Sequence, residues 1–175
     1  MNALLTPRVD VRRARGRPAS RLSWRDSKHS FSLGTNRPDP TTTHHGLLLV
    51  NNEDLVQPGT GFETHPHRDM EMVTWVLEGS LVHQDSSGHS GVIYPGLAQR
   101  MSAGTGILRS ENNDSYRATG EQPNEPVHFI QMWVVPDEAG VTPGYEQLEI
   151  DDELPSGALV TVAPGTDRHE SPRLG

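Results

Sequence analysis

The sequence predicts an all-β protein, a sandwich or barrel built from many short strands. Seventeen glycines and fourteen prolines interrupt the 175-residue chain at short intervals. The segments between them are short and rich in β-branched, aromatic and other apolar residues. No window of helical length carries an apolar period of 3.6 residues. Short strands at regular spacing, divided by turn residues, are typical of sandwiches and barrels.

Eight segments fit strands, in the order 47–50, 62–67, 72–77, 81–85, 91–94, 98–102, 107–111 and 127–135. Turn residues separate several of them: Glu78-Gly79 joins two strands, Ser87-Gly88 fits a hairpin tip, and Pro95-Gly96 fits a tight turn. We expect a single barrel domain over residues 1–135. Residues 136–175 are rich in Pro, Gly, Asp and Glu, and they predict an extended arm with a mobile end after about Ala163.

The composition limits where such a protein works. The chain has no cysteine, which excludes disulfides, thiolate ligands and a cysteine nucleophile and is consistent with a cytoplasmic location. No apolar run approaches the roughly 18 residues of a membrane span. The first thirty residues also lack the apolar stretch of a signal peptide. We therefore expect a cytoplasmic protein without a membrane partner.

Charge is distributed unevenly along the chain. Residues 1–40 hold nine basic against three acidic residues, a net charge of +6, which leaves −14 for the rest of a chain whose formal charge is −8. A basic arm could contact nucleic acid or an acidic partner. The simpler interpretation is an edge strand whose arginines pair with the acidic body. Because that body is too acidic for a nucleic-acid surface, we do not expect nucleic acid as a partner.

The most informative motif is His65-Pro66-His67, followed downstream by Arg109-Ser110-Glu111. Residues two apart on a strand point to the same face, so His65 and His67 can direct two imidazoles at one point. Glu111 on a second strand could add a carboxylate. Two histidines and a carboxylate can bind iron, zinc or manganese. Arg109 cannot ligate a metal, because its guanidinium stays protonated.

Around this motif the spacing resembles the cupin pattern: Gly59, His65-Pro66-His67, Glu71 and Gly79, then Gly91, Pro95-Gly96, position 109 and Asn113. The detail resembles the pirin family. The similar segments include Val50-Asn51-Asn52-Glu53-Asp54, His65-Pro66-His67-Arg68-Asp69-Met70-Glu71, His83-Gln84-Asp85-Ser86, Met101-Ser102-Ala103-Gly104-Thr105-Gly106 and His128-Phe129-Ile130-Gln131-Met132-Trp133. The resemblance covers about residues 20 to 150.

This resemblance implies a cupin double-stranded β-barrel of the jelly-roll type, with a metal site in the N-terminal of two tandem cupins. Carried over residue by residue, the metal ligands are His65, His67 and Glu111, and a third histidine is replaced by Arg109. Some pirins are similar to quercetin dioxygenases, which open a flavonol ring with O₂, and others are metal-dependent partners of transcription factors. This chain lacks the third histidine and stops where the second cupin would begin.

Two hypotheses follow from the direction of the Arg109 side chain. If it points away, His65, His67 and Glu111 bind Fe(II) or another divalent transition metal. The protein is then a quercetinase-type dioxygenase acting on a flavonol or related enolic aromatic, with Glu111 as a catalytic base. If Arg109 points inward, it repels the ion and pairs with Glu111. The protein is then a non-catalytic, pirin-like regulatory or binding protein for a small aromatic or anionic ligand.

The remaining polar and aromatic candidates receive structural interpretations. Glu71 could orient an imidazole but fits a structural role better, and His83 and Asp85 are expected to line the barrel. His128 is expected to pack in the core, and His44-His45 to lie on the surface. Barrel packing is expected for Phe62, Met72, Trp75 and Met101. Without a second cupin, one face of the barrel should be apolar, and we expect a homodimer to cover it.

Overall fold

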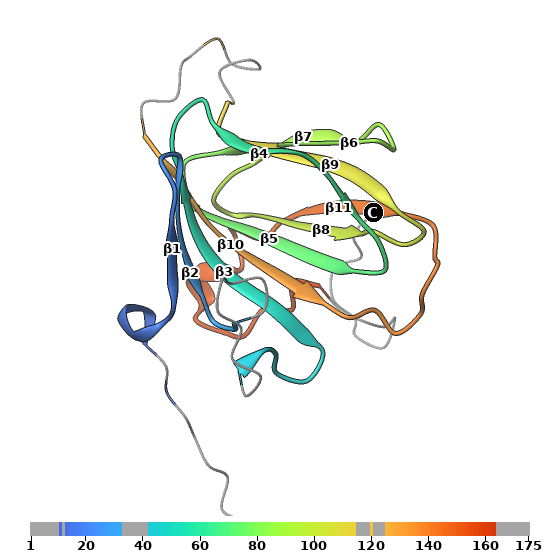
Figure 1. Ribbon diagram of the computed structural model, residues 1–175, viewed down its shortest axis with the longest axis horizontal. Helices are drawn as coiled ribbons and strands as arrows, with labels where there is room; N and C mark the ends of the chain where they lie inside the picture. The colour runs from blue at the N-terminus through green and yellow to red at the C-terminus, as the bar shows by residue number, and fades with distance from the viewer. Residues whose placement is uncertain (1–10, 12, 33–41, 115–119, 121–124, 164–175) are drawn as a thin grey trace, which may run out of the picture.

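The computed structural model describes residues 11, 13–32, 42–114, 120 and 125–163, and it consists of two antiparallel sheets packed face to face (Figure 1). The larger sheet has the order β1 (Ala19–Arg21), β2 (Arg25–His29), β3 (Leu48–Val56), β10 (Val127–Val134), β5 (Glu71–Glu78), β8 (Leu97–Ser102) and β11 (Gly144–Glu149). The smaller sheet has the order β4 (Gly61–His67), β9 (Ile107–Asn112), β6 (Leu81–Asp85) and β7 (Ser90–Ile93). Two short 3₁₀ turns, η1 (Ala14–Gly16) and η3 (Leu154–Ser156), complete the described elements.

The predicted all-β class and the cupin fold are confirmed. Each of the eight predicted segments overlaps a strand, and the glycines of the predicted turns, Gly79, Gly88 and Gly96, all have the positive φ angles that glycine readily adopts. The strand predicted at 47–50 is longer, because β3 continues to Val56 through the polar stretch after Val50. That stretch stays extended because β3 is paired on both sides, with β2 and with β10.

The described part of the basic N-terminal segment forms the edge of the larger sheet, as its simpler interpretation predicted. Strand β2 pairs with β3, and β1 pairs with β2. Arg17 forms an ion pair with Glu53 of β3, and Arg21 pairs with Asp26. Charged side chains on an edge strand also oppose edge-to-edge association.

The segment expected to be an extended arm adds a strand to the barrel. Gly144–Glu149 forms β11, which pairs with β8 along its whole length. This strand was not predicted, because Gly144–Glu149 carries only two apolar side chains, Tyr145 and Leu148. The expected mobile end, residues 164–175, lies outside the described residues.

Inside the barrel, polar residues form a layer between two apolar clusters. The sequence of β5 shows the pattern, because buried Met72, Thr74 and Val76 all face inward. Met72 belongs to one apolar cluster and Val76 to the other, so Thr74 lies between them. The strand register aligns Thr74 with Gln131 on β10 and Gln99 on β8, and aligns Gln99 with Gln147 on β11. We call these four residues the polar row.

Two of the predicted interior residues lie on the opposite face of the larger sheet. Trp75 alternates with the buried residues of β5 and is only partly buried, so the prediction that it packs inside the barrel is wrong. His128 alternates with buried Val127 and Phe129, and its Nε2 lies 3.2 Å from the Glu53 carboxylate. Core packing of His128 is therefore also wrong, because the period of two places it on the outer face.

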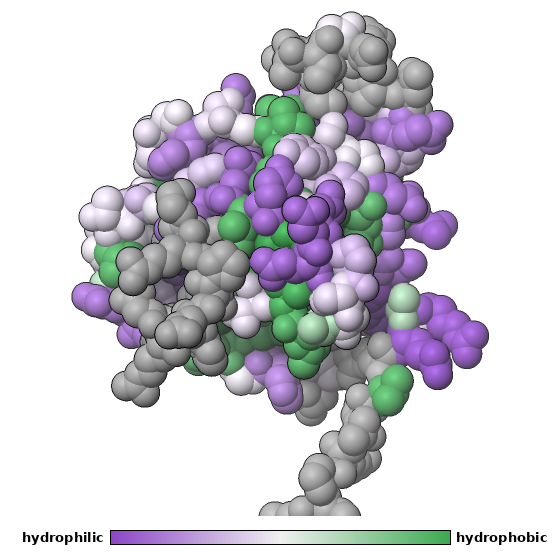
Figure 2. Space-filling view, turned by 180° about the vertical axis from the view of Figure 1, so that it is seen from behind, coloured by the Kyte–Doolittle hydropathy of each residue, from purple (hydrophilic) through white to green (hydrophobic). Residues whose placement is uncertain are grey.

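Exposed apolar side chains are distributed over the molecule. Large apolar residues with more than a third of their surface exposed are Val11, Leu22, Leu47, Leu77, Tyr94, Leu108, Val135, Leu154 and Leu159. On the side shown in Figure 2, apolar groups form a broken band crossed by hydrophilic side chains. The expected homodimer therefore stays a prediction. Among the described residues, no helix has the length and apolar character needed to cross a membrane.

Candidate functional site

The histidines of the His-Pro-His motif lie on β4, at the edge of the smaller sheet. The register places His65 beside Arg109 and His67 beside Ile107 of β9, with Pro66 exposed between the two histidines. An edge strand tolerates Pro66, because the missing N–H would face away from the ladder. The two imidazole centroids are 4.8 Å apart, and the His67 ring meets the Trp133 ring edge-on at 4.9 Å. The period of two thus places both imidazoles together, as the sequence predicted.

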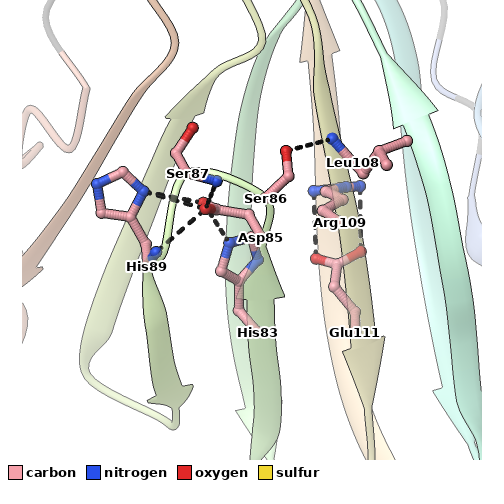
Figure 3. Close-up of polar contacts among 8 residues, drawn as sticks. All are labelled: His83, Asp85, Ser86, Ser87, His89, Leu108, Arg109 and Glu111. Atoms are coloured by element: carbon pink, nitrogen blue, oxygen red, sulfur yellow. Dashed lines mark hydrogen bonds and ion pairs between the residues drawn. The ribbon is translucent and has the colours of Figure 1, made fainter.

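Arg109 and Glu111 follow each other on the inward face of β9 (Figure 3). Both side chains are about 1% exposed. Arg109 Nη2 lies 3.1 Å from Glu111 Oε2, and Nη1 donates to Oε1 at 3.3 Å. Arg109 therefore points inward, and the guanidinium and carboxylate form a bidentate ion pair.

Gln131 on β10 connects this ion pair to the larger sheet. Its amide nitrogen donates to both carboxylate oxygens of Glu111, at 2.9 and 3.1 Å, and lies 3.2 Å from the Thr74 hydroxyl. Its amide oxygen accepts from Arg109 Nη2 at 3.1 Å and from Trp133 Nε1 at 2.9 Å. This single amide therefore fixes charged and aromatic groups from both sheets.

The two histidines of the motif are held in different ways. His65 Nδ1 lies 2.7 Å from the carbonyl oxygen of Glu63. A carbonyl only accepts, so His65 Nδ1 donates a proton to it. Burial, followed by the charge of Arg109 and the nearby His65, lowers the pKa of His67 to about 4. His67 Nε2 is buried and makes no hydrogen bond.

The neutral His67 has the protonation state that metal ligation needs, but the complete ligand set does not fit an ion. Among the described residues, no group of three or more His, Cys, Asp or Glu side chains could hold a metal. Glu111 is paired with Arg109 instead. A divalent ion about 4 Å from the guanidinium would be repelled by roughly 8 kcal/mol at an effective dielectric constant of 20. The inward direction of Arg109 is therefore incompatible with an ion bound by His65, His67 and Glu111 in this arrangement.

A second polar cluster lies beside the ion pair on β6 and β7 (Figure 3). The Asp85 carboxylate is fully buried and lies 3.2 Å from His83 Nε2 and 3.0 Å from His89 Nδ1. The Tyr145 ring stacks on both imidazoles, with centroids 4.8 Å from His83 and 5.2 Å from His89. Burial alone would raise the pKa of Asp85, but the hydrogen bonds from His83, His89 and Ser87 outweigh it and lower that pKa. Asp85 thus stays ionised and holds the two imidazoles.

Two open clefts border β4. One is lined by residues of the segments before β2 and around the start of β4, including Trp24, Phe62 and His65. The Arg25 guanidinium lies over both the Trp24 and Phe62 rings, at 5.1 and 5.0 Å from their centroids. The other cleft is lined at its polar side by His67, Arg68, Ser86 and Thr105. Each histidine of the motif is therefore reached from a different cleft.

The structural interpretations of the other candidates are mostly confirmed. Glu71 accepts a hydrogen bond from the Ser102 hydroxyl at 2.6 Å, which is a structural contact. His83 and Asp85 face inward, as expected, and His44 and His45 are exposed. Met72 and Met101 are buried, and Phe62 packs against the core.

Sequence reasoning missed Gln131, the residue that connects the two sheets. The signal was available, because Gln131 has the same parity as buried Val127 and Phe129 in a predicted strand. An inward-facing glutamine between apolar positions predicts a buried partner, since an amide is rarely left unpaired in a core. Its particular partners depend on the packing of two sheets and have no local signal.

The chain matches the Pirin family over residues 8–134. It is 62% identical over 161 residues to a Mycobacterium tuberculosis protein whose name provisionally assigns quercetin 2,3-dioxygenase activity, a match that covers 92% of this chain and 63% of that protein. It is 44% identical over 143 residues to the quercetin 2,3-dioxygenase of Escherichia coli, covering 82% of this chain and 58% of that protein. The chain thus spans about three fifths of the length of these relatives.

Among solved structures, the fold is similar to that of the bacterial pirin YhhW from Escherichia coli in complex with nickel(II). The TM-score is 0.71 and the identity 42%, over 79% of this chain and 57% of that chain. That structure contains a divalent metal ion. The likeness therefore extends to a cupin that binds such an ion, whereas here Arg109 is paired with Glu111.

Proposed function

This chain belongs to the pirin family, and from that premise we propose that it binds a flavonol or a related enolic aromatic compound in the cleft lined by Trp24, Phe62 and His65. The substrate class comes from the names of two relatives. One is named quercetin 2,3-dioxygenase, and the other carries that name provisionally. Because the chain spans only part of the length of those proteins, their activity is a proposal here.

The observation that carries the proposal is the cleft that holds Trp24, Phe62 and His65. Two aromatic rings along an open cleft offer apolar surface and edge or face contacts to a planar ligand. Their own centroids are 5.2 Å apart in an edge-to-face arrangement, so the cleft wall is preorganised. His65 lines the same cleft and faces Arg109 across the β4–β9 register.

Metal-dependent dioxygenation of that ligand is the finer proposal, and its support comes from the relatives. A divalent metal, when bound, would supply electron transfer and a template for O₂ and the enolate. In the present arrangement the chain offers no place for that ion, because Arg109 is paired with Glu111, the carboxylate that the ion would need. A second candidate, a non-catalytic binding protein, is favoured by this same buried ion pair.

The experiment is an anaerobic titration of the full chain with quercetin, followed by tryptophan fluorescence. Substitution Trp24→Leu or Phe62→Leu is expected to weaken binding about 3–10-fold, the value of one aromatic contact. Trp75→Leu is the matched control, because Trp75 lies on the outer face of the larger sheet. Absence of saturable binding, or an equal loss in Trp75→Leu, would disprove the site.

Oxygen uptake then separates the two candidates. Quercetin-dependent oxygen consumption after addition of Fe(II) or Ni(II) would support the dioxygenase. Tight quercetin binding without oxygen consumption would support the non-catalytic protein.

A further inference from the structure

The buried carboxylate of Glu111 depends on one cation. Glu111 and Arg109 are both about 1% exposed. Among the described residues, Arg109 is the only buried lysine or arginine. An isolated buried carboxylate is unstable, so this guanidinium is the permanent counter-charge of Glu111.

The same guanidinium also joins the two sheets. Arg109 and Glu111 belong to β9 of the smaller sheet, and both are hydrogen-bonded to Gln131 on β10 of the larger sheet. A cation at this point therefore links β9 of the smaller sheet to β10 of the larger sheet through Gln131.

The position of Arg109 separates this chain from a metal-binding cupin by a single side chain. His65 donates from Nδ1 to the Glu63 carbonyl, so Nε2 is the nitrogen that it could offer to an ion, and His67 Nε2 is buried without a partner. Both nitrogens are of the type that binds Ni(II) or Fe(II), and they lie on the strand next to Glu111. A histidine at position 109 would remove the repelling charge, release Glu111 and add a third imidazole.

We propose that Arg109 is a built-in replacement for the metal ion, which supplies the charge compensation and the link between the sheets, so that this barrel folds and keeps its pocket without a metal. The residue at position 109 alone then decides whether the barrel binds an ion. The replacement of the metal ion by Arg109 does not depend on whether quercetin binds.

The test measures metal content and thermal stability in the untagged full chain, with Ni(II) and, without oxygen, Fe(II). The native chain is expected to hold far less than one ion per chain after dialysis, and to show the same Tm with metal as with a chelator. Arg109→His is expected to hold close to one ion per chain. Its Tm should fall without metal and rise by about 5–10 °C at an ion concentration near 100 times Kd.

The matched control is Arg100→His, which changes a partly exposed arginine that pairs with Glu146 on the outer face. It should behave as the native chain does, and so exclude binding by any added histidine. His65→Gln in the Arg109→His background should abolish the ion and the rise in Tm.

Three results would overturn the proposal. One ion per native chain that is lost in His65→Gln would show that Arg109 yields to the metal. A folded Arg109→His chain without a bound ion would show that position 109 does not control binding. If Arg109→His does not fold, Arg109→Lys replaces it: lysine keeps the charge, so metal binding by that variant would also contradict the proposal.

Discussion

The guanidinium of Arg109 and the carboxylate of Glu111 meet in a buried, bidentate ion pair although the residues are only two apart on β9. The period of two places both side chains on the inward face of the strand, and the barrel excludes water from both. Gln131 then accepts from the guanidinium and donates to the carboxylate, so each charge is also hydrogen-bonded. A buried pair with these partners is costly to break from one side.

Neutralising the carboxylate should therefore destabilise the protein strongly. Glu111→Gln leaves the Arg109 charge buried without its partner, and we expect a loss of about 3–5 kcal/mol in the free energy of unfolding. Glu146→Gln is the control, because Glu146 pairs with Arg100 near the surface and should cost only about 0–1 kcal/mol. Urea unfolding measures both, and equal losses would contradict a special role for the buried pair.

Removing the amide that links the sheets should have a comparable effect through hydrogen bonds. Gln131→Leu keeps the volume but removes a hydrogen bond from Arg109 and two from Glu111, and it leaves Trp133 Nε1 without its partner. We expect a loss of at least about 2 kcal/mol, since each unsatisfied buried group costs about 1–3 kcal/mol. Gln147→Leu, in the same polar row but half-buried and with an unpaired amide nitrogen, should cost less than about 1 kcal/mol in the same urea experiment.

These contacts show how far the sequence determines the site. The His-Pro-His spacing and strand parity were sufficient to place His65 and His67 together and Arg109 with Glu111 on one face. The direction of Arg109 could not be predicted, because it depends on the free-energy difference between a solvated and a buried guanidinium. The buried guanidinium is stabilised by its hydrogen bond to Gln131, which is 22 residues away in the sequence and lies in the other sheet.

The fold shows the same division between local and distant causes. The strand Leu81–Asp85 was predicted with the ends that it has in the structure, whereas the other predicted strands differ at one end or both. Strand β11 was missed because its residues are held by pairing with β8 rather than by their own propensity. Trp75 and His128 were assigned to the interior by residue type, whereas strand parity, which was visible in the sequence, places them outside.

The segment before β11 is fixed by a close backbone approach at Gly104. A Cβ at this position would lie 2.1 Å from the carbonyl oxygen of Val141, which also accepts a hydrogen bond from Thr105 N. Gly104→Ala must displace the backbone of residues 141–143, and we expect it to cost at least about 2 kcal/mol more than Gly59→Ala. Gly59 also has a positive φ, but its Cβ would meet no atom within 4 Å. Thermal unfolding of the two variants measures the difference, and similar Tm values would disprove the contact.

The lowered pKa of His67 makes the stability of the metal-free protein depend on pH in a predictable direction. The pKa is about 4 in the folded protein, against 6.5 for an unperturbed histidine, because burial, Arg109 and His65 disfavour the charged ring. Between these two values the unfolded chain binds the proton and the folded chain does not. The contribution of His67 is therefore fully present above pH 6.5 and is lost progressively as the pH falls towards 4.

In His67→Gln this loss disappears, so the decline in the urea midpoint between pH 7 and pH 5 should be shallower than in the native chain. His44→Gln, at an exposed position, should keep the native slope. An unchanged slope in His67→Gln, or a His67 resonance that titrates near 6.5 by NMR, would show that the ring is not held neutral beside Arg109.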